Sequence, residues 1–134
     1  MRVRDVMTTK PQVTTPSTTL GDAAEQMAEG GFRHLPVVEG GALVGMVSER
    51  DLRSLILPRL IDRQALEEIR ARYDAPVSEL MVPDVETVDP ETSIRESAAR
   101  LLEAKVGALP VVDPSTGQLE GIVSYVDLLR ALSR

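Results

Sequence analysis

Two serine–aspartate pairs have the residue types and the spacing to hold a ligand. Ser48 precedes Asp51 by three residues, and Ser124 precedes Asp127 by the same distance, within the octapeptides GMVSERDL and GIVSYVDL. Each serine ends an apolar stretch typical of a strand and precedes a stretch typical of a helix. Backbone N–H groups at a helix start are unpaired donors, so a hydroxyl and a carboxylate beside them can bind a sugar and its phosphate.

The same spacing also predicts a purely structural role. A Ser-x-x-Asp sequence at a strand-to-helix junction is a capping box with aspartate in place of the usual glutamate or glutamine. The sequence alone leaves both interpretations open: the pair caps a helix, or it binds a ligand.

The two octapeptides belong to an internal repeat. Met7 and Met81 are separated by 74 residues, whereas Gly45 and Gly121 are separated by 76. The two additional residues fall between two expected strands of the second copy, where hairpin loops accept insertions. Both octapeptides keep Gly, Val, Ser, Asp and Leu at the same spacing, which indicates that these five positions have a shared role.

Each copy has the pattern strand, helix, strand, strand, helix. In the first copy we expect strands at 13–14, 35–38 and 43–47. The first helix is expected along Leu20, Ala23, Ala24 and Met27, with a stop at Gly30 and Gly31, and the second through Leu52, Leu55 and Ile56. In the second copy we expect strands at 86–88, 109–112 and 119–123. The first helix is expected along Ile94, Ala98, Leu101 and Leu102 after a cap at Thr92 or Ser93, and the second through Leu128, Leu129 and Leu132. This order predicts a parallel crossover beside an antiparallel hairpin.

A further helix is expected between the copies. Residues 60–73 are rich in helix formers, with Ile61, Ala65 and Ile69 four residues apart, and Pro58 and Pro76 bracket the segment. The helix is either a solvated linker or an added surface for a partner or second subunit.

The fold class follows from these elements. Each copy is shorter than about 60 residues and buries too little surface to be stable alone, so we expect the two copies to pack on each other. The sequence predicts an α+β protein of tandem β-α-β-β-α repeats, with residues 1–57 as the first repeat, 58–76 as a helical linker and 77–134 as the second repeat.

Composition argues against several classes of function. A net charge of −6 disfavours general nucleic-acid binding, and the absence of cysteine with a single histidine, His34, leaves little material for a metal site or a Ser-His-Asp relay. The chain lacks a Gly-x-x-x-x-Gly-Lys phosphate loop, so we do not expect an enzyme. No apolar run reaches the ~20 residues that span a bilayer and the N-terminus lacks a signal-peptide core, so we expect a cytoplasmic protein without membrane contact.

The repeated motifs resemble those of cystathionine-β-synthase-type (CBS) domains. They are the opening Asp-Val-Met that ends at Met7, matched by Glu-Leu-Met at 79–81, the Leu-Pro-Val-Val strands that begin at Leu35 and Leu109, and the two Gly-x-Val-Ser-x-x-Asp junctions. Their order and duplication cover nearly the whole chain and resemble a tandem CBS pair, or Bateman module. This resemblance implies a pseudo-two-fold packing of the repeats.

The resemblance also implies a function. Tandem CBS modules are regulatory and non-catalytic, and they bind an adenosine-containing ligand such as AMP, ADP, ATP or S-adenosylmethionine in the cleft between the repeats. No cofactor is required, although a bound nucleotide could carry Mg. A homodimer and an unidentified regulated protein are the implied partners. The alternative is a purely structural module for dimerisation or docking that binds no ligand.

Site residues carried over from the family centre on the two junctions. The ribose-binding aspartate falls on Asp51 and Asp127, and the neighbouring hydroxyl falls on Ser48 and Ser124. One carboxylate can accept hydrogen bonds from both vicinal hydroxyls of a ribose. The other residues implied to bind the ligand are Thr8, Gln12, Val13, Thr14, Phe32, Arg33, His34, Val106, Gly107 and Ala108, with the segment 84–86.

The two junctions differ in charge. Arg33, His34, Arg50 and Arg53 lie near the first, whereas the matching positions of the second are Gly107, Ala108, Val126 and Leu129. We hypothesise that the basic groups of the first repeat, Arg50 included, hold the phosphates of the ligand. The alternatives are that these arginines are solvated surface charges and that His34 is a half-buried polar residue without a role in binding.

Overall fold

The computed structural model describes residues 1–54 and 63–133 and is a mixed α+β structure. Its elements, in order, are α1 (Val3–Val6), β1 (Thr8–Thr9), α2 (Leu20–Gly30), β2 (His34–Glu39), β3 (Ala42–Ser48), α3 (Glu49–Arg53), α4 (Arg63–Tyr73), the 3-10 helix η1 (Val77–Glu79), α5 (Ile94–Ala104), β4 (Ala108–Val112), β5 (Leu119–Ser124) and α6 (Tyr125–Leu132). The expected helical positions Leu55, Ile56 and Ile61 lie outside the described residues, as does Pro58.

The contacts divide the chain into two compact units that differ from the sequence repeats. The first-repeat unit comprises residues 13–39 and 44–83, and the second-repeat unit comprises residues 1–12, 40–43 and 84–134. The opening segment of each repeat therefore packs with the elements of the other repeat. The contact boundaries consequently lie away from the repeat boundaries at 57 and 77.

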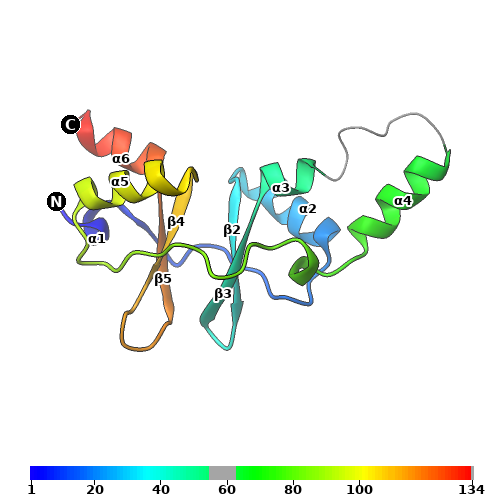
Figure 1. Cartoon of the computed structure of the whole chain (residues 1–134), viewed down its shortest axis with the longest axis horizontal. Helices are drawn as coiled ribbons and strands as arrows, with labels where there is room; N and C mark the ends of the chain where they lie inside the picture. The colour runs from blue at the N-terminus through cyan, green and yellow to red at the C-terminus, as the bar shows by residue number, and fades with distance from the viewer. Residues whose placement is uncertain (55–62, 134) are drawn as a thin grey trace. The chain divides into compact units, whose positions relative to one another are not determined.

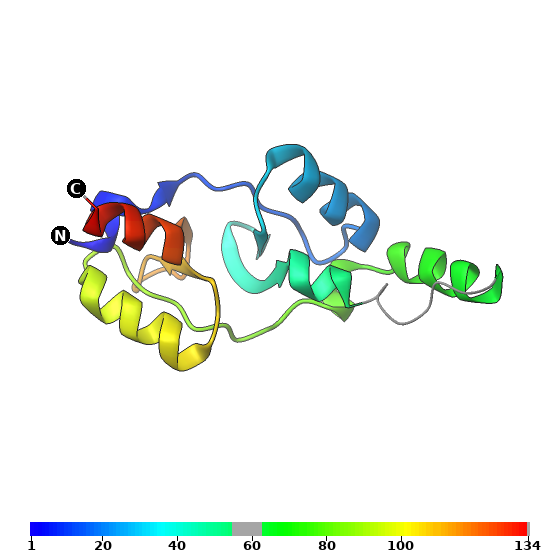
Figure 2. The same cartoon turned by 90° about the horizontal axis from the view of Figure 1, so that it is seen from above.

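The second-repeat unit is built on a three-stranded sheet of order β1-β5-β4. Strand β5 pairs antiparallel with both neighbours. The strand expected at 86–88 is reduced to one isolated parallel bridge, from Val88 to Val111 of β4. Helices α5 and α6 lie at the end of the β4–β5 hairpin away from its turn, and α1 lies beside α6 (Figures 1 and 2). The apolar core consists of Val3, Val88, Leu101, Leu109, Val111, Val123 and Leu128.

The first-repeat unit repeats this arrangement around β2 and β3. Thr14 makes the parallel bridge to Val37 of β2, and Val82 makes an antiparallel bridge to Met46 of β3. Gly40 and Gly41 form the tight turn between these strands at φ values of 61° and 85°, which favour glycine. The core consists of Leu20, Ala23, Met27, Leu35, Val37, Val47, Leu52 and Val77.

Capping residues mark the ends of α2 and the start of α5. Thr19 caps α2 by accepting from the Asp22 N–H at 3.1 Å, and Gly31 ends it in the left-handed conformation. Of the two expected caps of α5, Ser93 is the one that accepts, from the Glu96 N–H at 3.1 Å. The expected linker helix is confirmed as α4, which extends outward from α2 and α3 (Figure 1).

Three leucines of the second repeat lie on the surface. Leu102 of α5 is 79% exposed, and Leu129 and Leu132 of α6 are 59% and 73% exposed. On α5 the adjacent Leu101 takes the core position, and neighbouring helical residues point about 100° apart. On α6 the core contact is made by Leu128 and Ala131, which are both buried. The expectation that Leu102 belongs to the apolar stripe of α5 was therefore wrong, whereas the last helix does run through Leu128, Leu129 and Leu132 as expected.

Each hairpin contains one glycine that admits a neighbouring segment. A Cβ atom on Gly121 would lie 2.7 Å from the backbone oxygen of Thr8 and 2.8 Å from Met7 Sδ. A Cβ on Gly45 would lie 2.7 Å from Met81 Sδ and 3.0 Å from the backbone oxygen of Val82. The repeated glycine is therefore explained by the close approach of the opening segment of the other repeat.

We predict that Gly121→Ala lowers the free energy of unfolding by about 1–3 kcal/mol, because the new methyl group must displace the backbone of β1. Gly45→Ala should cost less, because its nearest contact is the end of a flexible methionine side chain. Urea unfolding measures both. Equal stability of Gly121→Ala and the wild type would contradict the close contact.

Candidate functional site

The first serine–aspartate junction is a reciprocal helix cap. Strand β3 ends at Ser48, and α3 begins at the next residue. The Ser48 N–H donates to Asp51 Oδ2 at 2.9 Å, and the Asp51 N–H donates to Ser48 Oγ at 3.1 Å. Both residues are half-buried. The interpretation of this motif as a capping box is confirmed.

The second junction has the same geometry with one additional bond. The Ser124 N–H donates to Asp127 Oδ2 at 2.8 Å, and the Asp127 N–H donates to Ser124 Oγ at 3.2 Å. The Ser124 hydroxyl also donates to Asp127 Oδ2 at 3.1 Å. In both repeats, a capping box therefore begins the helix that follows the hairpin.

All five positions shared by the octapeptides now have a structural cause. The glycines admit a neighbouring segment, the serines and aspartates cap helices, and the valines and leucines, Val47, Val123, Leu52 and Leu128, are core residues. The duplication of this motif therefore does not by itself require a ligand.

The caps use only one oxygen of each carboxylate. Within the part of the chain that the structure describes, no hydrogen bond or ion pair engages Oδ1 of Asp51 or of Asp127. A carboxylate oxygen has two lone-pair directions and can accept from two hydroxyls. One aspartate can therefore cap the helix through Oδ2 and bind a ribose through Oδ1.

The residues before the Leu-Pro strands lie at these junctions. The Glu49 N–H, at the start of α3, donates to the Arg33 carbonyl at 2.9 Å, and the Tyr125 N–H donates to the Gly107 carbonyl at 3.1 Å. Ala108 is the Cα partner of Ser124 across β4 and β5. The two segments, distant from the octapeptides along the chain, thus meet them in space, while the role in ligand binding that the resemblance implies for them stays a prediction.

The pKa of His34 is set by burial and by two charged residues of the first junction. Burial lowers the pKa of His34 below its ordinary value of 6.5, the Asp51 carboxylate raises it in part, and the Arg33 guanidinium lowers it further. Burial dominates because removing an imidazolium from water costs more than one nearby carboxylate returns. The imidazole is therefore predominantly neutral at neutral pH and can accept or donate one hydrogen bond.

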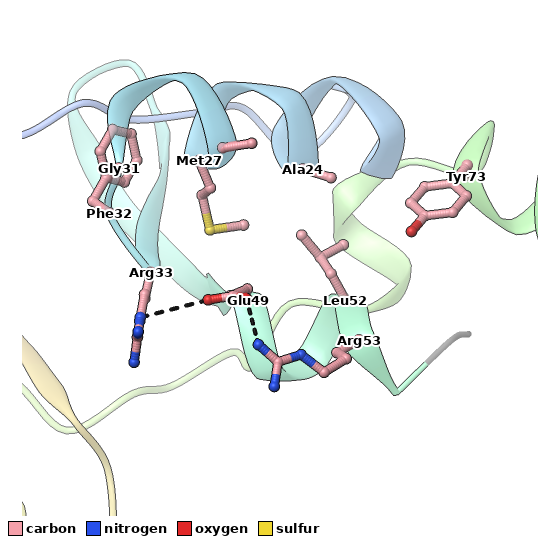
Figure 3. A pocket seen from close by; sticks show the side chains of 10 residues that line it. Ala24, Met27, Gly31, Phe32, Arg33, Glu49, Leu52, Arg53 and Tyr73 are labelled. Carbon is pink, nitrogen blue, oxygen red and sulfur yellow. Dashed lines mark hydrogen bonds and ion pairs between the residues drawn. The ribbon is translucent and has the colours of Figure 1, made fainter. Parts of the chain in front are cut away.

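Two of the candidate phosphate-binding arginines are engaged with Glu49. Arg33 Nε lies 3.7 Å from Glu49 Oε2, and Arg53 Nη2 lies 2.5 Å from Glu49 Oε1 (Figure 3). The hydrogen bond from Arg53 lowers the pKa of the Glu49 carboxyl. Arg50 is exposed and makes no ion pair with any other described residue. An anion that binds Arg33 must therefore compete with Glu49, whereas Arg50 is available.

A hollow of about 390 Å³ lies between α2 and α3 on the side of these ion pairs. Figure 3 shows Met27, Leu52 and Phe32 around it and the Tyr73 ring at one end. The complete lining is Ala24, Met27, Ala28, Gly31, Phe32, Arg33, Glu49, Leu52, Arg53 and Tyr73. The sequence predicted Phe32 and Arg33 as ligand residues, but it carried no signal for a hollow on this helix pair.

The remaining predicted site residues are divided between the units. Thr8, in β1, and Gln12 belong to the second-repeat unit and are exposed. Val13 belongs to the first-repeat unit, is exposed and accepts from Gln26 Nε2 at 3.1 Å. Val106 is exposed just after α5. Their grouping around one ligand stays a prediction.

Thr14 is an unusual member of the predicted set. It is 4% exposed, and its buried Oγ1 has no hydrogen-bond partner among the described residues. The matching position of the second repeat is Val88, a core residue. A buried hydroxyl without a partner costs free energy, so either the position tolerates this cost or a bound molecule satisfies the hydroxyl.

The family comparison identifies the chain. The CBS domain family matches residues 3–58 and 77–134. The chain belongs to the CBS domain family. Its fold also matches that of solved CBS-pair proteins, so the expected tandem CBS architecture is confirmed.

Several CBS proteins are similar over most of this chain. Protein MJ1225 of Methanocaldococcus jannaschii is 31% identical over 96% of the chain, and YhcV of Bacillus subtilis is 31% identical over 94%. The matches cover 46% of MJ1225 and 81% of YhcV, so the chain spans about half the length of the first relative. Among solved structures, CBSX2 of Arabidopsis thaliana in complex with AMP is 36% identical, with a TM-score of 0.82 over 98% of this chain and 96% of that one.

The described helices carry two further findings. None of them has the length and the apolar composition needed to cross a membrane. Within residues 1–54 and 63–133, no cluster of three or more histidine, aspartate or glutamate side chains is arranged to hold a metal ion.

We predict that Thr14→Val raises the free energy of unfolding by about 1 kcal/mol, because it removes an unsatisfied hydroxyl while keeping the volume of the side chain. Val88→Thr at the matching position is the control and should lower it by about 1–3 kcal/mol. Chemical denaturation measures both. A loss of stability in Thr14→Val would show that the hydroxyl is satisfied in the folded protein.

We predict that His34 makes stability depend on pH. Because its pKa is lower in the folded than in the unfolded chain, the unfolded chain gains the proton first as pH falls below about 6.5. The free energy of unfolding should therefore be higher at about pH 7.5 than at about pH 5.5, and His34→Gln should reduce this difference. An imidazole titration followed by NMR that places the pKa above 6.5 would contradict the prediction.

Proposed function

We propose that the protein is a regulatory, non-catalytic module that binds an adenosine-containing ligand at the Ser48–Asp51 junction. The observation that carries this proposal is that no residue described by the structure engages Oδ1 of Asp51, which lies beside the start of α3. Support comes from CBSX2, which is 36% identical to this chain and forms a complex with AMP.

The chemistry of the junction suits a ribose. The cap holds Asp51 in one orientation, because Oδ2 is bound by the Ser48 N–H at 2.9 Å. A carboxylate that is already oriented loses little side-chain entropy when its second oxygen accepts from a diol. Hydrogen bonds to an ionised acceptor are also stronger than those between neutral groups.

We propose that the first junction is the one that holds a phosphate. Arg50 is exposed and free of ion pairs with the described residues, and His34 and Arg33 lie at the same junction. Val126, Ala108 and Gly107 occupy the matching positions of the second repeat and offer no charge. A phosphate-bearing nucleotide therefore gains more at the first junction, whereas the second suits an uncharged nucleoside group.

We further propose that occupancy is transmitted to a regulated protein or to the self-association of the chain. A bound ligand stabilises the state that binds it by mass action, so any contact that differs between the empty and loaded states responds to ligand concentration. AMP, ADP, ATP and S-adenosylmethionine are the ligands to compare, with Mg²⁺ present and absent for the phosphorylated ones.

A second candidate function is a structural module without a ligand. The observation in its favour is that every shared position of the octapeptides has a packing or capping role. On this account, removal of the aspartates changes stability alone. The two candidates are separated by whether affinity and stability change together.

We predict that Asp51→Asn weakens AMP binding at least ~10-fold, because the atom that replaces Oδ1 belongs to an NH2 group, which donates and cannot accept from the ribose hydroxyls. The amide oxygen of asparagine can still accept from the Ser48 N–H, so the cap should survive and stability should change by less than about 1 kcal/mol. Isothermal titration calorimetry and urea unfolding give the two readouts.

Asp127→Asn is the matched control for this experiment. It makes the same chemical change at the uncharged junction and should affect the affinity for AMP less than Asp51→Asn does. If no adenosine-containing ligand binds the wild type, or if both variants bind AMP as the wild type does, the ligand proposal fails and the structural module is favoured.

A further inference from the structure

Two half-buried methionines hold matching positions in the two units. Met7 lies directly after α1, and Met81 lies two residues after η1. A Cβ atom on the hairpin glycine would lie 2.8 Å from the sulfur of Met7 at Gly121 and 2.7 Å from that of Met81 at Gly45. Each thioether therefore fills the space that a missing side chain leaves in the neighbouring strand.

Met7 lies between the two attachments of the first opening segment. Its backbone N–H donates to the Val3 carbonyl at 2.9 Å, and the Val3 side chain is completely buried in the core of the second-repeat unit. The next residue, Thr8, is the Cα partner of Ile122 in β5. The sulfur contact with Gly121 thus connects the buried valine to the strand pairing.

Met81 has the same place in the second opening segment. Its N–H donates to the Val77 carbonyl at 2.9 Å, and the Val77 side chain is completely buried in the core of the first-repeat unit. The next residue, Val82, exchanges two backbone hydrogen bonds with Met46 of β3, at 2.8 and 3.0 Å. Both units therefore use a methionine at the same point of the attachment.

The other three methionines differ in exposure. Met27 and Met46 are 3% and 7% exposed, so an oxidant dissolved in water has little access to them. Met1 is 62% exposed, so little of its side chain packs against the protein. Met7 and Met81 are partly open to water and also pack against the cores of their units. Their oxidation would therefore be both possible in the folded protein and felt by it.

We propose that Met7 and Met81 are sites of reversible oxidation by a peroxide, and that the sulfoxide loosens the opening segment that each one attaches. A lone pair of the thioether sulfur attacks one oxygen of hydrogen peroxide, and the O–O bond breaks. The departing hydroxide takes the proton of the transferred oxygen and leaves as water, so the sulfur loses two electrons and the peroxide gains them.

The modification can be reversed by a thiol-dependent methionine sulfoxide reductase. The sulfoxide oxygen then leaves as water while two thiols are oxidised to a disulfide. No adenosine-containing ligand takes part in either direction. The proposal therefore goes beyond the proposed function and does not depend on it.

The added oxygen is unfavourable at the glycine contact for two reasons. A sulfoxide is strongly polar and requires a hydrogen-bond donor, whereas the thioether packs against apolar side chains. The side of the sulfur that faces Gly121 or Gly45 is also closed by the strand. The oxidised side chain must turn toward water, which removes the contact between the opening segment and the hairpin.

Peroxide treatment of the folded chain tests the proposal. Peptide mapping by mass spectrometry should find sulfoxide at Met1, Met7 and Met81, with Met27 and Met46 still reduced. The equilibrium constant for unfolding in urea should rise about 10-fold for each of the two half-buried sites that is oxidised. Methionine sulfoxide reductase with a thiol should restore the original value.

Leucine variants assign the effect to each site. Methionine and leucine have similar volumes, and leucine cannot be oxidised by a peroxide. After peroxide treatment, Met7→Leu should show faster amide hydrogen exchange at residues 77–82, and Met81→Leu should show it at residues 3–9. The double variant should keep its stability in peroxide, whereas the control Met1→Leu should lose stability as the wild type does. The two single variants test the proposal even where the double variant fails to fold.

Three outcomes would overturn the proposal. Met7 and Met81 that stay reduced while Met1 is oxidised would show that their sulfur atoms are out of reach in the folded protein. Sulfoxide at both sites with unchanged unfolding and hydrogen exchange would show that the opening segments do not depend on the thioethers. Equal losses of stability in the peroxide-treated wild type and double leucine variant would place the damage elsewhere in the chain.

Discussion

The structure depends on the close approach of a short opening segment to a glycine in a hairpin strand. In the second-repeat unit, Thr8 and Thr9 pair with Ile122 and Gly121, and in the first-repeat unit Val82 bridges Met46 next to Gly45. Each opening segment also supplies a fully buried valine, Val3 or Val77, to the core that it joins. Neither unit can complete its core from one repeat, so the chain must fold with both repeats present.

The helix caps show how one side chain can serve stability and binding. The strand-to-helix junction needs an acceptor for a backbone N–H, and Oδ2 of Asp51 or Asp127 supplies it. The second carboxylate oxygen faces no such demand from the described residues. A residue that caps the helix thereby places a carboxylate oxygen at the helix start, where it can accept from hydroxyl groups.

The two repeats keep the same interior and differ at their surfaces. Core positions match closely, as Val37 matches Val111 and Leu52 matches Leu128. The positions of Arg33, His34 and Arg50 at the first junction are occupied by uncharged residues at the second. The helix pair α2–α3 also differs from the pair α5–α6 in surface shape and in charge. Packing constrains a duplicated core because a change of one methylene group is felt there, whereas surface positions are free to diverge toward different partners.

The sequence alone determined the repeat, the order of the long helices and hairpin strands, and the helix caps. These depend on local spacing and on the pairing of strands that lie close along the chain, which periodicity and capping chemistry reveal.

Tertiary structure decided which unit each opening segment joins and which leucines are buried. Composition cannot tell Leu101 from Leu102, because the choice depends on the rotation of α5 against its sheet. It also cannot place Met7 beside Gly121 or Met81 beside Gly45, because these contacts join segments that are distant in sequence and are selected by the space that a missing Cβ leaves. The Asp51 oxygen that no described residue engages, and the hollow between α2 and α3, follow from the same three-dimensional arrangement.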